Sequence, residues 1–172
     1  MHKAHDLQSW AFFMQRFLTP NPSNPAAHNS HEQQPSVYIC VVNPVLTKIT
    51  SGVRITVHPR FEENLSCASE ESYVFSYHIT MENQNNFPVK LLRRHWFIFD
   101  SQGIKREVEG AGVVGETPLI MPGEFFSYSS ACDLRAPRGS MHGFYTMQRF
   151  GSEEILEIKV PLFNLEVPFS LS

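Results

Sequence analysis

The residues most suggestive of chemistry in this chain are Gly110, Gly112 and Gly115, which are spaced as G-x-G-x-x-G. In a dinucleotide-binding protein, glycines with this spacing open a helix whose N-terminus holds a pyrophosphate. Here Pro118 and Pro122 follow closely. Proline in a helix interior removes a hydrogen bond and collides with the preceding turn. We therefore expect the glycines to lie in a loop or at a strand edge of a β protein.

A second binding chemistry stays open for the same glycines. Successive backbone N–H groups in a turn can hold an anion without any helix. A bound phosphate also needs a nearby cation, and Arg94 or Arg106 could supply it. The competing interpretation is a tight connection in which only glycine tolerates the backbone angles. Gly110, Gly112, Gly115 and Arg94 are thus a candidate site for a phosphate-containing small molecule.

Metal and catalytic sites find less support in the sequence. The closest histidine pair is His28-x-x-His31, which lies in a proline-rich stretch and lacks the cysteine partners typical of zinc. Ser140 does not have the G-x-S-x-G spacing of a hydrolase nucleophile. Glu109 and Glu116 flank the glycines and are expected to be solvated carboxylates. The sequence predicts no metal site, no cofactor and no enzymatic activity.

Composition narrows the class of protein further. The chain has 172 residues, with 14 basic and 17 acidic side chains and a formal charge of −3, so it lacks the basic excess typical of nucleic-acid binders. Its 3 cysteines are widely separated, which favours a reducing compartment. No apolar run approaches the ~20 residues of a membrane span, and no secretory signal is recognisable. We expect a cytoplasmic protein without a membrane span.

The first fifty residues differ in character from the rest of the chain. Residues 5–18 carry apolar side chains at the spacing of an amphipathic helix, namely Leu7, Trp10, Phe13, Met14 and Phe17. The apolar side of this helix must cover the main domain, a partner or a membrane surface. Residues 19–36 are rich in Pro, Asn and Ser and are predicted to be a linker. Residues 1–50 are therefore interpreted as an N-terminal extension, with a short strand expected within residues 37–49.

Residues 51–172 have the pattern of a β domain. Apolar and polar side chains alternate over residues 73–82, as in a half-buried strand. Further strands are expected at 53–57, 91–100, 104–109, 124–132, 141–150, 154–163 and 164–171. Short strands separated by turn signals, without a helical pattern between them, are typical of an antiparallel sandwich.

Two pairs of adjacent aromatic residues point to a surface. Trp96-Phe97 and Phe125-Phe126 must each place one ring on either side of their sheet, because side chains alternate along a strand. Exposed aromatic residues often mark an association surface. We predict that Trp96 and Phe126 anchor a protein partner or a second copy of the chain, with Arg94 at the rim.

Several ordered motifs resemble those of the ApaG domain family, over about Val53 to Ser172. They are SYVFSYHITMENQ, LLRRHWFIFDSQG, VEGAGVVGETPLIMPGEFFSYSS, PRGSMHGFYTM and IKVPLFNLEVP. The resemblance implies an immunoglobulin-like or fibronectin-III-like β-sandwich. It also implies a link to cobalt and magnesium efflux or resistance, and a role in protein–protein interaction where the domain occurs beside an F-box or in a polymerase-interacting protein. It implies nothing about residues 1–50.

Overall fold

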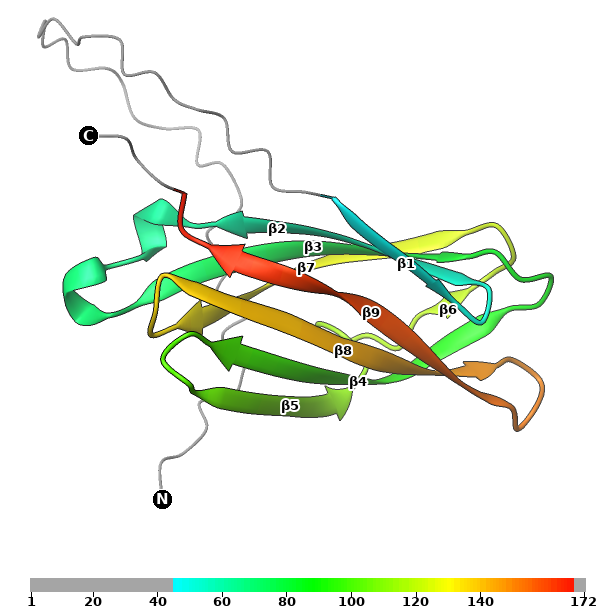
Figure 1. Cartoon of the computed structure of the whole chain (residues 1–172). Helices are drawn as coiled ribbons and strands as arrows, with labels where there is room; N and C mark the ends of the chain where they lie inside the picture. Colours follow the sequence, from blue (N-terminus) through cyan, green and yellow to red (C-terminus); the bar gives the residue numbers. More distant parts are fainter. Residues whose placement is uncertain (1–44, 169–172) are drawn as a thin grey trace, which may run out of the picture.

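The computed structural model describes residues 45–168, which form two antiparallel sheets packed face to face (Figure 1). The first sheet has the order β1 (Leu46–Thr50), β2 (Val53–Phe61), β3 (Tyr73–Asn83) and β7 (Phe125–Leu134). The second has the order β5 (Lys105–Ala111), β4 (Val89–Asp100), β8 (Arg138–Arg149) and β9 (Ile155–Glu166), and the short β6 (Leu119–Ile120) also pairs with β4. Two short 3₁₀ turns, η1 (Glu63–Leu65) and η2 (Ala68–Glu70), lie between β2 and β3. The predicted antiparallel β-sandwich is confirmed; the predicted helix at 5–18 and the linker at 19–36 lie outside the described residues.

The alternation seen in the sequence decides which side of each strand faces inward. In β2, Val53, Ile55 and Val57 are fully buried, whereas His58 is exposed. β3 pairs with β2 so that Ile79 lies opposite Val57, and both side chains enter the same core. The burial of alternate β-branched and aromatic side chains therefore fixes the register, because a slip of one residue would turn the apolar set outward.

The core between the sheets is rich in aromatic rings. The ring of Trp96 lies 5.8 Å from that of Tyr77 and 5.9 Å from that of Tyr145, centroid to centroid. The Tyr128 and Tyr145 hydroxyl oxygens are 2.7 Å apart and form a hydrogen bond. Burial raises the pKa of both phenols well above the ordinary value. Both hydroxyls therefore stay protonated at neutral pH. Each is the hydrogen-bond partner of the other, so neither buried hydroxyl is left without a partner in the core.

Two boundaries differ from the sequence prediction. The first sheet begins at Leu46, before the expected domain boundary at residue 51, because β1 pairs with β2 along its whole length. The expected strands at 154–163 and 164–171 are one strand, β9. Phe163 and Leu165 are both buried, with exposed Asn164 between them, so the same alternation continues through the supposed break.

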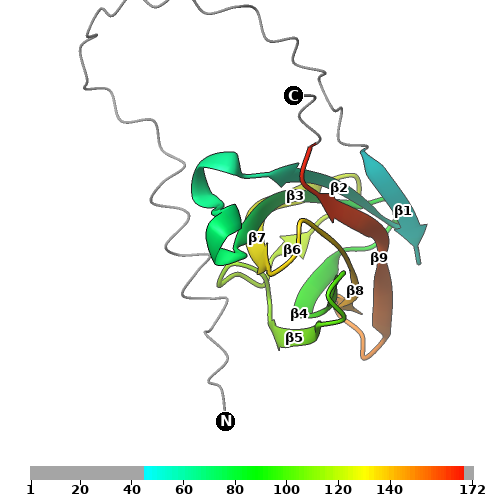
Figure 2. The same cartoon turned by 60° about the vertical axis from the view of Figure 1, so that its left-hand side comes forward.

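The lateral edges of the two sheets approach each other on both sides of the sandwich (Figure 2). On one side β1 contacts β9. On the other, Arg106 of β5 donates to the carboxylate of Asp133 in β7, with Nη1 3.0 Å from Oδ1, and also to the Asp133 main-chain carbonyl. This pair joins the edge strands of opposite sheets.

Candidate functional site

The glycine run leaves the end of β5 and closes a tight turn. Gly110 is in β5, whereas Gly112 has φ 54° and Gly115 has φ 83°. Val114 also has a positive φ of 45°, and Val113 and Glu116 exchange two main-chain hydrogen bonds of 2.8 and 2.9 Å. Positive φ at both central residues is the pattern of a type I′ hairpin turn. The glycines therefore lie at a strand end and in a turn, as expected, and they do not begin a helix.

A different local constraint acts on a side chain at each of the three glycine positions. A Cβ on Gly112 would lie 2.1 Å from the Glu116 carbonyl oxygen, so this position has no room for a side chain. A Cβ on Gly110 would lie 3.1 Å from Nη1 of Arg94. A Cβ on Gly115 would meet nothing within 4 Å, and only the left-handed backbone favours glycine there.

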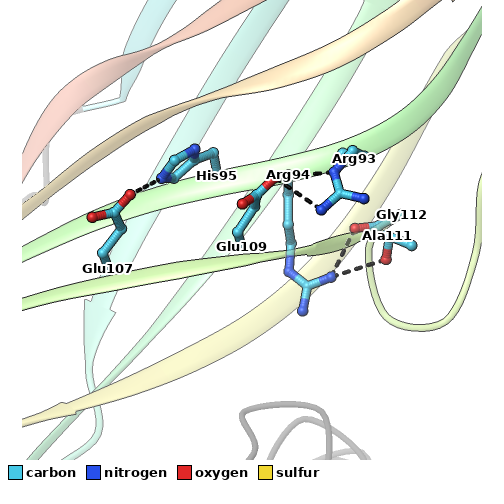
Figure 3. A network of polar contacts seen from close by, with 7 residues as sticks. All are labelled: Arg93, Arg94, His95, Glu107, Glu109, Ala111 and Gly112. Atoms are coloured by element: carbon cyan, nitrogen blue, oxygen red, sulfur yellow. Dashed lines mark hydrogen bonds and ion pairs between the residues drawn. The ribbon is translucent and has the colours of Figure 1, made fainter.

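Arg94 reaches the glycine run, as the phosphate hypothesis requires (Figure 3). Its Nη1 donates to the carbonyl oxygens of Ala111, at 3.1 Å, and Gly112, at 2.9 Å. The N–H groups of Gly112 and Val113 donate to the carbonyls of Leu92 and Glu116. The loop thus presents carbonyl oxygens to the guanidinium, and an anion would compete with these contacts. Phosphate binding at this loop stays a prediction.

The predicted partner anchors require a correction. Trp96 is only 3% exposed and lies in the core, so its ring cannot contact a partner in the folded chain. Phe126 is half-buried and packs against the core, whereas its neighbour Phe125 is 69% exposed. Alternation shows that one ring of each pair faces outward, but the sequence alone did not establish which. In the first pair the outward ring is Phe97.

An aromatic surface covers the outer side of the second sheet. We name it the aromatic face and define it by side chains of β4, β8 and β9: His95, Phe97, Phe99, His142, Phe144 and Leu162. The rings of His95 and Phe97 stack with centroids 4.6 Å apart. His142 lies 5.1 Å from Phe97, and Phe144 lies 4.9 Å from His95. Direct pairing of His95 with Phe144 and of Phe97 with His142 across β4 and β8 produces this cluster.

One end of the aromatic face is hollowed. A cavity of ≈ 590 Å³ opens between Phe97, Phe99 and His142, and Leu162 lines it from β9. Phe99 is 42% exposed and Leu162 is 58% exposed. Covering such side chains removes apolar surface from water, which is the main favourable contribution in most protein association.

Charged groups form a rim along β5 beside this surface (Figure 3). Arg93 donates through Nε, at 3.0 Å, and Nη2, at 2.9 Å, to one carboxylate oxygen of Glu109. His95 Nε2 lies 2.5 Å from Oε1 of Glu107. An apolar aromatic centre with a polar rim is the usual anatomy of a protein–protein interface.

The outer side of the first sheet is different, because it is covered by hydroxyl and imidazole groups. Thr80 bonds to Ser127 across β3 and β7, with 2.9 Å between the hydroxyl oxygens. His78 Nδ1 lies 3.0 Å from the hydroxyl of Ser129 in the same pair of strands. The two outer surfaces are therefore chemically unequal: among the described residues, the rings on the outer side of the first sheet are the His58–His78 imidazole pair, 6.4 Å apart, and the isolated Phe125, whereas the second sheet carries a cluster that includes Phe97 and Phe144.

Sequence reasoning missed the aromatic face, because the pattern along this strand is ambiguous. In LLRRHWFIFD, the residues that share a side with Phe97 include Arg93 and His95, whereas those that share a side with Trp96 include Ile98. Arg94 and Asp100 share the side of Trp96, however, so charge does not separate the two sides, and the sequence alone leaves the outward ring of this pair open.

Two kinds of feature are absent from the described residues 45–168. No three His, Cys, Asp or Glu side chains in this part of the chain gather as a metal-binding group. No helix in the same range has the length and apolar character needed to cross a membrane.

These features define a β-sandwich of the immunoglobulin and fibronectin-III type, with a clustered aromatic surface on one sheet. The family model described as the ApaG domain matches residues 63–149, and the chain belongs to this family. The family resemblance inferred from the motifs is thereby confirmed.

Sequence relatives and solved structures agree with this assignment. A protein named ApaG from Methylorubrum extorquens strain PA1 is 45% identical over 119 residues, which are 69% of this chain and 91% of the relative. A protein of the same name from Rhodospirillum centenum is 40% identical over 126 residues, 73% of this chain and 96% of the relative. A crystal structure of a Bordetella pertussis protein described as ApaA superimposes with a TM-score of 0.65 at 35% identity and covers 74% of this chain and 98% of that chain.

Proposed function

We propose that this chain is a non-enzymatic interaction module that docks a protein partner through the aromatic face. The observation that carries the proposal is the asymmetry of the sandwich: the outer side of one sheet is mainly polar, with Phe125 as an isolated exposed ring, whereas the other sheet is lined by clustered rings. Fully burying a Phe or Leu side chain contributes about 1.5–3 kcal/mol. Because Phe99 and Leu162 are each about half exposed, covering them would contribute about 1 kcal/mol apiece.

The rim would govern recognition more than affinity. Arg93 and Glu109 are each about half exposed, at 53% and 50%, so their ion pair contributes little to folding stability. At an interface, such rim charges steer encounter and reject partners of the wrong charge pattern. We therefore expect salt to slow association with the partner.

The link of the family to cobalt and magnesium efflux would, in this proposal, be indirect. The support is that residues 45–168 contain no cluster of three metal-binding side chains. A partner that handles the metal would then supply the chemistry. Cys67 and Cys132 are free thiols, which supports placing the module in the reducing cytoplasm.

A second candidate function is the binding of a phosphate-containing small molecule at Gly110–Gly115. One observation favours it, namely that the Arg94 guanidinium lies against Gly110 and Gly112. Millimolar pyrophosphate should then raise the melting temperature of the full chain, and Arg94→Gln should abolish the rise. An equal rise in the variant would remove this candidate.

The interaction proposal is tested by affinity capture with the full chain. Partners captured by the wild type should be lost with the double variant Phe97→Ser, Phe99→Ser. Phe125→Ser is the matched control, because it removes an exposed ring from the other sheet. A partner retained equally by all three proteins would contradict docking at the aromatic face.

A further inference from the structure

We propose that residues 5–18 of this same chain occupy the aromatic face, so that the module carries an internal competitor for its partner. This inference rests on the proposed function only in taking the aromatic face as the docking surface. Two observations support it: the chemistry of the segment, and the position at which the chain enters the sandwich.

The segment has the chemistry that the aromatic face would bind. Its apolar side chains recur at the spacing of one helical stripe and are Leu7, Trp10, Phe13, Met14 and Phe17. Aromatic rings and methionine sulfur both pack favourably on other rings. Within residues 5–18, Asp6 is the only acidic residue and Arg16 is the only arginine or lysine, so docking of the segment would remove few charges from water. An amphipathic helix laid on an apolar surface is a recurring mode of peptide recognition.

The chain enters the sandwich on the side that leads to this surface. Val45 immediately precedes β1, and β1 contacts β9, which is an edge strand of the second sheet (Figure 2). From β9 to β5 the sheet spans about 15 Å, at ~4.8 Å per strand step. The connecting residues 19–44 would span about 28 Å as a flexible coil and at most about 90 Å when extended. The tether is therefore long enough to carry the segment around β9 to the aromatic face.

Tethering makes even a weak contact significant. A flexible linker holds a segment at an effective concentration on the order of millimolar. A segment whose intrinsic Kd is about 0.1 mM would then occupy the face about 90% of the time. A partner would bind with its apparent affinity reduced about tenfold until the segment is displaced.

Trp10 provides the test, because the chain has 2 tryptophans and the other, Trp96, is buried in the core. The emission of Trp10 is obtained as the difference between full-length wild type and full-length Trp10→Phe. We expect it to be blue-shifted, and less quenched by acrylamide, relative to a synthetic peptide of residues 1–18. The double variant Phe97→Ser, Phe99→Ser should return it to the peptide value, and Phe125→Ser should not.

Leu162→Glu is a second variant for the same measurement. It changes a side chain that is 58% exposed, and it leaves the core intact, so it should release Trp10 without unfolding the domain. Three results would overturn the proposal: peptide-like emission in the wild type, a shift that survives both face variants, or a shift that grows with protein concentration together with a dimer in sedimentation. None of these results would alter the capture of a partner by the aromatic face, so the two proposals fail separately.

Discussion

Replacing Gly112 by Ala tests whether the G-x-G-x-x-G run is required for packing. Gly112 has φ 54°, a conformation that costs a non-glycine residue about 1–2 kcal/mol. The new Cβ would also lie 2.1 Å from the Glu116 carbonyl oxygen and 2.8 Å from its carbonyl carbon. The turn cannot move away freely, because two hydrogen bonds tie Val113 to Glu116. Overpacking of this kind costs about 1–3 kcal/mol, so we expect a total loss of about 2–5 kcal/mol.

Gly115→Ala is the matched control, because the conformational cost remains while the steric cost disappears. Its φ is 83°, and a Cβ there meets nothing within 4 Å. The expected loss is about 1–2 kcal/mol. Urea unfolding followed by circular dichroism measures both variants at constant m-value. Equal losses for the two, or a larger one for Gly115→Ala, would refute the claim that the Glu116 carbonyl makes glycine necessary at position 112.

Two further predictions concern buried ionisable groups. Asp100 accepts hydrogen bonds from the N–H groups of Gln102 (2.9 Å), Arg135 (2.6 Å) and Ala136 (3.1 Å). Asp100→Ala should lower the free energy of unfolding by about 3–5 kcal/mol, and Asp100→Asn by less; equal losses in urea titrations would contradict this account. Burial raises the pKa of the Cys132 thiol to about 12, so only the unfolded chain ionises it near pH 9. Ionisation of this thiol in the unfolded chain should therefore lower stability by about 1.4 kcal/mol between neutral pH and pH 10. Cys132→Ala should remove this part of the fall in the urea midpoint, and a smaller fall near pH 10 should remain because the pKa values of the buried phenols of Tyr128 and Tyr145 are also raised.

The strands were largely predictable because their chemistry repeats locally. The alternation around Tyr77 and Ile79 predicts an inward and an outward side before any partner strand is known. β1 was harder to assign, since only Leu46 and Thr50 are partly covered and its other side chains are exposed. Its place in the sheet comes from pairing with β2, a contact that its own composition does not indicate.

The candidate site was less predictable, because it depends on which strands become neighbours. Phe97 and His142 are far apart in sequence and meet only because β4 pairs with β8 in one register. Trp96 was wrongly predicted to be a partner anchor, because it is a large ring next to other aromatic residues. Its side chain instead lies on the same side of β4 as that of buried Ile98. The glycine run was interpreted more reliably, since backbone conformation at glycine and proline is a local property.

The contact between Arg106 and Asp133 also affects how copies of this protein can meet. β5 and β7 are terminal strands of their sheets, and such strands can template the addition of a strand from another molecule. Arg106 occupies a main-chain acceptor of β7, and Arg94 occupies the carbonyl of Ala111 at the end of β5. A strand that added along this flank would have to displace both guanidinium groups from these carbonyls, so the two contacts disfavour edge-to-edge pairing between copies of the sandwich.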